Sequence, residues 1–255
     1  MQERTQTAGI KLWKWLLLPG TLVVIWMAYV WAQALPTFMD PESARIIFWH
    51  VPMAWLGLIW FWVGAFHAVR YLYGARRGQP EQDRRSAVAG ELGLICTVLA
   101  TVTGMVFAWK QWGAPWNWDP KQVGISVLIL VYLAYFGLRM SVENPELRGR
   151  LSAVYTILAA FSSPFLTYVL PNLPQVAKLH PPGQTITGGL DTKWRIIYTL
   201  SFVMLMGTTL WTYELRLRFE KVAERLASLA EAGVARRHGT RTEAVRKPVG
   251  SGVGE

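Results

Sequence analysis

The stretch from Ile46 to Val69 reads IIFWHVPMAWLGLIWFWVGAFHAV and contains no charged residue. An α-helix crosses the hydrocarbon core of a bilayer in roughly 20 residues, so a run of this length is typical of a membrane span. Five further runs are equally free of charge: 15–39, 92–109, 122–138, 151–177 and 196–213. A β-barrel would instead show strands of about 10 residues with alternating polarity. The sequence therefore predicts an all-α integral membrane protein with six transmembrane helices.

The distribution of basic residues predicts the orientation of these helices. The chain has a formal net charge of +10, and 20 of its 26 Lys and Arg residues lie before the first run, between the second and third, between the fourth and fifth, or after the sixth. The positive-inside rule then places both termini in the cytoplasm. Three loops face outward, at 36–49, 110–121 and 172–194. Because the membrane accounts for the basic charge, we expect a lipid membrane and no nucleic acid as partner.

The chain is predicted to have three parts. A transmembrane domain covers 1–215, a cytoplasmic amphipathic helix covers 216–235, and a disordered tail covers 236–255. From the end of the first part through the second, apolar residues recur at steps of four and three and form one stripe on a helix. These residues are Leu215, Phe219, Val222, Leu226 and Leu229. Such a helix would lie on the cytoplasmic leaflet or dock a partner, whereas the tail has too few apolar residues to bury a core.

The second outward loop is rich in tryptophan. Residues 109–121 read WKQWGAPWNWDPK, with four tryptophans. One interpretation is an aromatic belt at the headgroup level. Gly113 and Pro115 favour a shaped loop instead, one that presents indole faces to a flat apolar ligand with a polar edge. Asp119 followed by Pro120 and Gln122 is typical of a helix start, so we expect Asp119 to cap the fourth helix and lock the loop to it.

Two of the four histidines lie at the predicted outer surface, His50 at the start of the second span and His180 in the last outer loop. Imidazole is a common ligand of haem iron, and two imidazoles on opposite faces of a porphyrin complete its coordination. A single histidine at a membrane interface is more often structural. Cations near the outer helix ends could hold haem propionates or anchor the interface by snorkelling. They are Arg45, Lys110, Lys121, Lys193 and Arg195.

The segment WGAPWNWD, residues 112–119, resembles the tryptophan-rich WWD signature of haem-handling proteins. The length, the six spans, the segment IIFWHVPMAW over 46–55, Pro164 and the pair Leu179-His180 resemble the cytochrome c maturation protein C family within that group. The ending Asp119-Pro120-Lys121 is the one seen in the longer cytochrome c synthetase relatives. The resemblance covers roughly residues 10 to 215.

The resemblance implies a protein of the bacterial cytoplasmic (inner) membrane that binds haem b (iron protoporphyrin IX) on the outer side, for cytochrome c-type biogenesis. The haem would pass to a membrane-tethered haem chaperone. ABC-type ATPase and permease subunits and a small single-span subunit are the further partners implied. His50 and His180 would be the metal ligands, and the WWD loop would support the porphyrin. The loop residues so assigned are Trp112, Gly113, Trp116, Trp118, Asp119 and Lys121.

Two other functions remain open on the sequence alone. A b-type haem electron-transfer subunit of a membrane oxidoreductase also uses two histidines, although it usually buries them inside the bundle on facing helices. A transporter with the Trp-rich loop as a gate is a third hypothesis, but the spans carry few polar groups to line a path. Transfer of haem would be of the haem lyase type and would need no constellation of catalytic side chains.

Overall fold

The computed structural model describes residues 12–36, 38–74, 79–173, 179–180 and 190–246, and these residues form helices joined by turns and loops without a strand. The elements are α1 (Leu12–Trp15), α2 (Leu17–Trp26), the π-helix η1 (Met27–Trp31), the 3-10 helix η2 (Ser43–Ile46), α3 (Ile47–Tyr73), α4 (Pro80–Trp112), α5 (Pro120–Ser141), α6 (Pro145–Pro164), the π-helix η3 (Phe165–Val169), the 3-10 helix η4 (Leu170–Asn172) and α8 (Thr192–Arg246).

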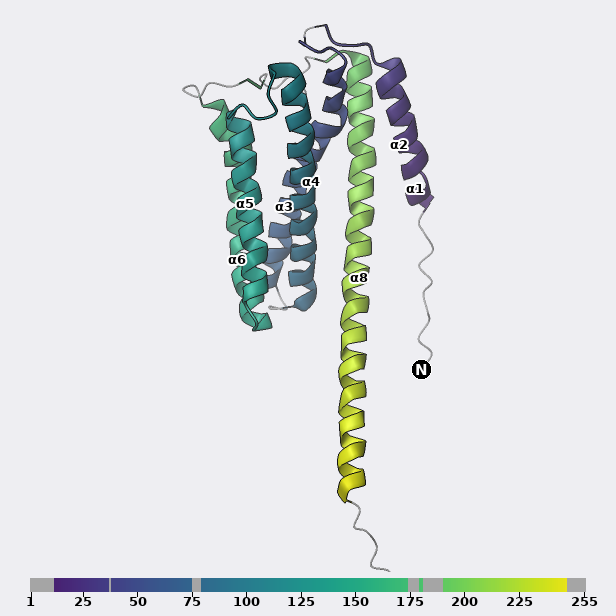
Figure 1. Cartoon of the computed structure of the whole chain (residues 1–255), viewed down its shortest axis with the longest axis vertical. Helices are drawn as coiled ribbons and strands as arrows, with labels where there is room; N and C mark the ends of the chain where they lie inside the picture. The colour runs from purple at the N-terminus through teal and green to yellow at the C-terminus, as the bar shows by residue number, and fades with distance from the viewer. Residues whose placement is uncertain (1–11, 37, 75–78, 174–178, 181–189, 247–255) are drawn as a thin grey trace, which may run out of the picture. The chain divides into compact units, whose positions relative to one another are not determined.

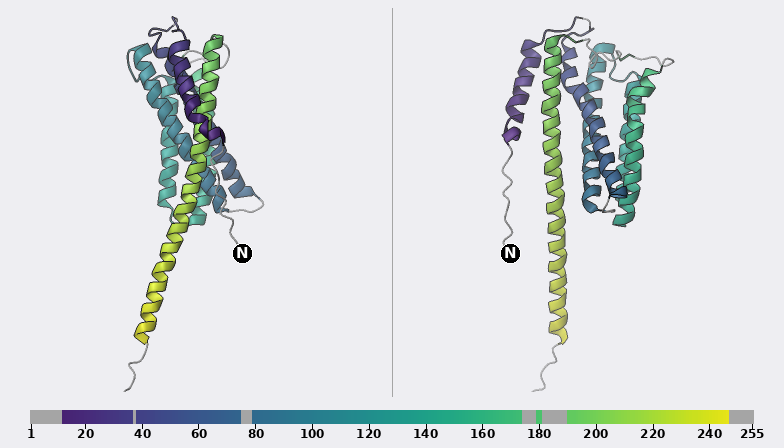
Figure 2. Two further views of the ribbon diagram at one scale, coloured as in Figure 1. Left: turned by 90° about the vertical axis from the view of Figure 1, so that its right-hand side faces the viewer. Right: turned by 180° about the vertical axis from the view of Figure 1, so that it is seen from behind.

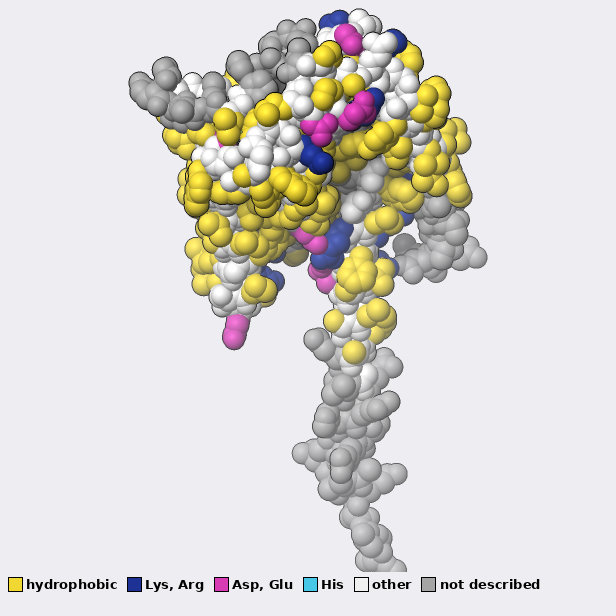
Figure 3. Space-filling model, turned by 45° about the horizontal axis from the view of Figure 1, so that its top comes forward, with side chains coloured by type: hydrophobic (Ala, Val, Ile, Leu, Met, Phe, Trp, Pro, Cys, Tyr) yellow, Lys and Arg dark blue, Asp and Glu magenta, His cyan; other side chains and the backbone are white. Residues whose placement is uncertain are grey.

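Six helical stretches are long and apolar enough to cross a membrane, which confirms the six predicted spans. They are Leu12–Trp31, Ser43–Tyr73, Pro80–Trp112, Pro120–Ser141, Pro145–Asn172 and Thr192–Ala230. Hydrophobic side chains dominate much of the coloured surface of the bundle in Figure 3. The chain is therefore a multi-pass membrane protein, and the sidedness of its termini stays a prediction.

Proline and an N-cap side chain set where the middle helices begin. Pro80, Pro120 and Pro145 each occupy the first turn of a helix, where the missing N–H group costs no hydrogen bond. Asp119 caps α5 by accepting a hydrogen bond from the backbone N–H of Lys121, as predicted. Asn144 caps α6 in the same way. The N-cap hydrogen bonds thereby join the turn before α5 and the turn before α6 to the helix that follows each of them.

Polar contacts between neighbouring helices reinforce the packing of α3, α4, α5 and α6, which lie together in Figures 1 and 2. Ser86 of α4 donates to the carbonyl of Gly64 in α3 at 2.9 Å. Arg139 of α5 forms two hydrogen bonds with the carboxylate of Asp83 in α4, at 2.6 and 2.9 Å. These bonds satisfy polar groups that lipid could not solvate.

The start of α3 packs against the first span and the start of α8. Phe48, Trp194 and Ile197 are fully buried in one cluster there, and the Phe48 and Trp194 rings lie 4.5 Å apart. Arg45, also buried, donates to the carbonyls of Ala28 and Ala32 at 2.8 and 2.9 Å. These carbonyls lie at the end of the first span, so the Arg45 side chain ties that helix end to the entry of α3.

The chain forms two compact units, residues 1–213 and 214–255. The helix α8 contains the sixth span and continues to Arg246, so residues 236–246, predicted to be a disordered tail, are helical in the structure. Residues 247–255 of that tail lie outside the described residues. The apolar stripe of the second unit is exposed, from 48% at Leu215 to 67% at Leu229. The three-part division of the chain stays a prediction.

Candidate functional site

A cavity of about 530 Å³ lies where α3, α4, α5, η3 and η4 meet, next to the turn between α4 and α5. Both predicted outer histidines line it, together with Trp116 and Lys121. Most of its remaining wall is apolar, and its hydroxyl groups belong to Thr97, Thr101, Thr167 and Tyr168. The turn between α4 and α5 and the entry of α3 lie at the same end of the bundle in Figure 1. The structure therefore brings His50 and His180 to one cavity, although they are far apart in the sequence.

His50 lies in the first turn of α3 and has a defined tautomer. Its Nδ1 lies 2.8 Å from the carbonyl oxygen of Ala100 in α4. A carbonyl can only accept, so Nδ1 carries the proton and the lone pair is on Nε2. Gly104 makes room for the ring, because a Cβ at this position would lie 2.7 Å from His50 Cε1. His50 therefore presents an unprotonated nitrogen suitable for a metal.

Pro52 links the surroundings of His50 to α8. Proline has no N–H group, so the carbonyl of Phe48, one turn earlier in α3, lacks its helical partner. Ser201 of α8 donates its hydroxyl to this carbonyl and satisfies it. The first turn of α3 is thus held from the α8 side as well as from α4.

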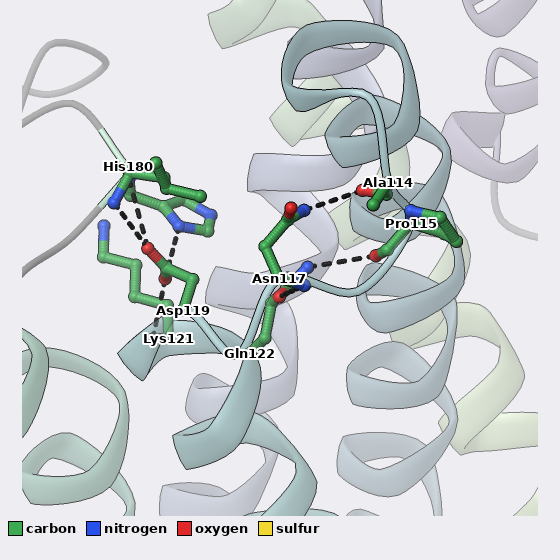
Figure 4. Close-up of polar contacts among 8 residues, drawn as sticks. Ala114, Pro115, Asn117, Asp119, Lys121, Gln122 and His180 are labelled. Carbon is green, nitrogen blue, oxygen red and sulfur yellow. Dashed lines mark hydrogen bonds and ion pairs between the residues drawn. The ribbon is translucent and has the colours of Figure 1, made fainter.

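His180 is held by Asp119, as Figure 4 shows. Its Nδ1 lies 2.7 Å from Asp119 Oδ1, and the backbone N–H groups of Leu179 and His180 lie 2.7 and 3.4 Å from Oδ2. Burial disfavours the charge on Asp119, but the hydrogen bonds from His180, Leu179 and Lys121 outweigh burial and hold its pKa well below the ordinary value. The carboxylate therefore accepts from Nδ1, which leaves the lone pair of His180 on Nε2 when the ring is neutral.

The turn between α4 and α5, residues 113–119, is called the Trp-rich turn, and hydrogen bonds and two left-handed residues define its shape. Gly113 ends α4 with φ 78°, a left-handed conformation that favours glycine. Gln122, predicted only as a helix-start residue, donates to the carbonyl of Pro115 at 3.1 Å and accepts from the N–H of Asn117 at 2.8 Å (Figure 4). Trp118 adopts φ 55°, an uncommon value for a residue with a side chain. The turn is therefore a shaped loop, as the sequence predicts.

The tryptophans of this turn and Trp112, the last residue of α4, lie in different places. Trp116 lines the cavity. Trp112 packs edge-on against the His180 ring at 5.0 Å between ring centroids. Trp118 is 76% exposed and packs edge-on against Trp116 at 5.8 Å. Trp112 therefore contacts one histidine, Trp116 faces the cavity, and Trp118 offers an indole to the outside.

Of the five predicted outer cations, Lys121 is the one that lines the cavity among the described residues. Arg45 does not line it, because its side chain is bound to the end of the first span and to Glu42. Lys110 and Lys193 lie over the rings of Trp109 and Trp31, at 5.7 and 5.5 Å from the ring centroids. Arg195 donates to Thr192. Lys121 is thus the cation best placed to bind an acidic group in the cavity.

Two residues of the site were not recognised in the sequence. Gly104 borders the His50 ring. Gln111, although next to Lys110, is buried, and its amide donates to the Asp40 carbonyl and the Ser43 hydroxyl and accepts from the Met39 N–H. In the sequence, the position of Gln111 between Trp109 and Trp112 is the only sign that its amide is buried. This sign does not identify its hydrogen-bond partners, which lie about 70 positions away. Gln111 ties the Trp-rich turn to the segment that leads into His50.

The donor set fits an iron porphyrin better than a bare metal ion. Over the parts of the chain that the structure describes, no group of three or more His, Cys, Asp or Glu side chains is placed to hold a metal. A porphyrin supplies four nitrogens of its own, so two imidazoles complete its iron. The cavity lies within the size range of small-molecule sites, and its largely apolar wall suits a porphyrin face. His50, His180 and Lys121 are the residues that could hold haem.

Comparison with known proteins places this architecture in a family. The profile of the family described as Heme exporter protein C matches residues 2–230. A protein of this description from Bradyrhizobium diazoefficiens is 27% identical over 237 residues, covering 88% of this chain and 88% of the relative. Those from Paracoccus denitrificans and Escherichia coli K12 are 28% and 26% identical and cover 75% and 58% of this chain, and 81% and 60% of their own length. Because the profile matches nearly the whole chain, this protein belongs to the Heme exporter protein C family.

Proposed function

We propose that this chain binds haem at the outer face of the bacterial cytoplasmic membrane and delivers it to a membrane-tethered haem chaperone for c-type cytochrome biogenesis. The description of its relatives as heme exporters supports a role in haem handling. The observation that carries the proposal is the pair of imidazoles, His50 and His180, that line one apolar cavity. Each has its Nδ1 bonded to an oxygen and can offer Nε2.

The cavity residues would bind haem b as cargo. His50 and His180 would each donate one nitrogen to the iron, and Trp116 would pack against the porphyrin. Lys121 would attract a propionate, which orients the macrocycle in the cavity. Haem, when bound, would supply a vinyl group to which the histidine of the chaperone could bond. The work of this chain is positioning, and its own side chains perform no proton transfer.

Delivery requires a surface that an acceptor can reach. The exposed indole of Trp118, in contact with Trp116 at the cavity wall, provides an apolar contact outside the cavity. Tyr168 of η3 lines the same cavity and is 65% exposed, so the cavity reaches the surface at η3 as well. We propose that the chaperone contacts the Trp118 side. The ABC-type ATPase and permease subunits and the small single-span subunit would act as further members of the complex.

Visible spectra of the purified full-length protein test haem binding. We expect wild-type protein from haem-replete cells to carry low-spin haem, and His50→Ala and His180→Ala to lose the low-spin spectrum or the haem. His67→Ala is the matched control, because His67 is bonded to Gln82 and does not line the cavity. Wild-type protein without haem, or an unchanged spectrum in both cavity variants, would contradict the proposal.

Delivery is tested by co-expression with the haem chaperone and by staining for covalently bound haem on the chaperone. We expect staining with wild-type protein and its loss with either histidine variant. An electron-transfer subunit would instead show reversible reduction by a quinol and would leave the chaperone unstained. His180 lies on a loop and not on a helix, which favours delivery, since electron-transfer subunits usually hold haem between facing helices within the bundle.

A further inference from the structure

The two proposed iron ligands differ in the oxygen that holds their Nδ1 nitrogen. His50 donates to the backbone carbonyl of Ala100, a neutral acceptor, at 2.8 Å. His180 donates to the carboxylate of Asp119 at 2.7 Å. Hydrogen bonds to an ionised acceptor are roughly twice as strong as those to a neutral one. The His180 ring therefore has a charged hydrogen-bond acceptor at Nδ1, and the His50 ring has a neutral one.

The Asp119 carboxylate is held by hydrogen bonds from two segments of the chain. Its side chain is fully buried, with 0% exposure. Oδ1 accepts from the N–H of Lys121 at 2.9 Å as well as from His180 Nδ1, and Oδ2 accepts from the N–H groups of Leu179 and His180. Both oxygens face N–H donors, so a carboxylate fits and a protonated acid would direct a hydrogen toward a donor. The start of α5 and the His180 segment thus share one negative group.

We infer that Asp119 is a positioning residue that makes His180 the stronger electron donor of the two ligands and thereby favours ferric haem in the site. The inference rests on the proposed function, because it concerns haem bound between His50 and His180. The sequence accounts for Asp119 as a helix cap, and the resemblance places it in the loop that supports the porphyrin. The structure adds a hydrogen bond to the ring of a proposed ligand.

The physical basis is the transfer of electron density through the ring. A carboxylate that accepts from Nδ1–H raises the basicity of Nε2, because it stabilises positive charge on the imidazole. A more basic axial nitrogen stabilises the higher oxidation state of iron and lowers its midpoint potential. The charge of Asp119 also favours ferric iron, which carries one more positive charge than ferrous iron. Both effects act in the same direction, whereas the Ala100 carbonyl gives His50 only a neutral partner.

The variant Asp119→Asn removes the charge, and it also replaces Oδ2, which accepts from the N–H groups of Leu179 and His180, by an amide nitrogen. Asparagine is as good an N-cap as aspartate, and its amide oxygen can still accept from Lys121 and from His180 Nδ1. We expect the midpoint potential of bound haem to rise in a spectroelectrochemical titration of the full-length protein. We also expect haem affinity to fall by about ten- to a hundredfold, the usual effect of removing a partner of a metal ligand.

Two further variants distinguish the effect of the Asp119 charge on the haem from the effect of losing a helix cap. Asn144→Ala removes the cap of α6, where Asn144 accepts from Glu146 and Leu147 and contacts no histidine, and it should leave the potential unchanged. Asp119→Glu keeps the charge, so its potential should stay closer to that of the wild type than the potential of Asp119→Asn. An unchanged potential in Asp119→Asn, or an equal rise in Asp119→Glu, would overturn the inference and leave haem binding intact.

A measurement on the wild type covers the case in which Asp119→Asn loses haem completely. Imidazolate character in one axial ligand narrows the spread of the g values of low-spin ferric haem in electron paramagnetic resonance. We expect a narrower spread than for haem with two neutral imidazoles in the same detergent. Equal spreads would contradict the inference. Wild-type protein that carries no haem would instead contradict the proposed function.

Discussion

The two histidines of the cavity reach it by different routes, one on a helix and one on a loop. His50 lies in a regular turn of α3, and its ring is held by Ala100 and Gly104 of the neighbouring α4. His180 belongs to the short described segment 179–180 between α6 and α8, and it is held by Asp119 and by the edge of Trp112. A helical ligand depends on the packing of two helices, and a loop ligand depends on one polar group.

The largest loss of haem affinity should come from a change at Gly104, because the His50 ring packs directly against this glycine. In Gly104→Leu the new side chain must occupy space taken by the His50 ring, whose Cε1 would lie 2.7 Å from a Cβ. We expect haem affinity to fall at least about a hundredfold, the equivalent of roughly 3 kcal/mol, within the usual cost of overpacking. Haem titration of the detergent-solubilised protein measures this fall.

The matched control for this position is Gly137→Leu. Gly137 lies in α5, and a Cβ there would meet nothing within 4 Å. We expect haem affinity close to that of the wild type and unfolding at the same or a higher temperature, because leucine favours a helix more than glycine does. Equal losses in both variants would mean that added bulk, and not the His50 contact, is responsible.

The connection between the Trp-rich turn and the entry to α3 should give the next largest effect. Gln111→Leu leaves the Met39 N–H and the Asp40 carbonyl without this partner. A buried polar group that loses its partner costs about 1–3 kcal/mol. We expect a lower unfolding temperature, and a loss of haem affinity smaller than in Gly104→Leu. Gln82→Leu, which removes the bond to His67 instead, should leave haem affinity unchanged.

The six spans and the shape of the Trp-rich turn could be predicted because they depend on local sequence. Runs without charge predict membrane helices, and Asp119 before Pro120 predicts a helix start, whatever the rest of the chain does. Gly113 and Pro115 likewise predict a loop in place of a plain helix end, and the structure adds the left-handed conformation of Gly113. These features need no knowledge of which helices touch.

The partners within the site could not be predicted, because they join segments that are distant in the chain. Asp119 has the local pattern of a helix cap, and nothing near it in sequence indicates the bond to His180. Arg45 is adjacent to the outer loop and was a candidate for propionate binding, but its guanidinium satisfies helix-end carbonyls of the first span. Polar side chains can serve several acceptors, and only the three-dimensional arrangement selects one.

A smaller effect should follow from the end of α4, on the His180 side. In Gly113→Ala the residue must hold φ 78°, although a Cβ there meets no atom within 4 Å. The strain of a left-handed residue costs about 1–2 kcal/mol, so we expect a modest fall in unfolding temperature. Gly137→Ala adds the same methyl group to a regular helix and should raise that temperature. A neutral Gly113→Ala would show that the turn relaxes without strain.

The smallest expected effect concerns pH and the carboxylate that holds His180. Hydrogen bonds lower the pKa of Asp119 below its ordinary value of 3.8, so its stabilising contribution is complete above that value and is lost as pH falls through the folded pKa. We therefore expect haem-free wild type to unfold at a higher temperature than Asp119→Asn at about pH 5, where the carboxylate is charged in the folded and in the unfolded chain. Below about pH 4 the difference should shrink. The unfolded chain then binds a proton on this carboxylate, whereas the folded wild type keeps the carboxylate charged until a lower pH, so protonation stabilises the unfolded state. A difference that instead falls steadily from pH 8 to pH 5 would show that Asp119 titrates in the folded protein near neutral pH, and that its bonds to the His180 segment are weaker than the distances indicate.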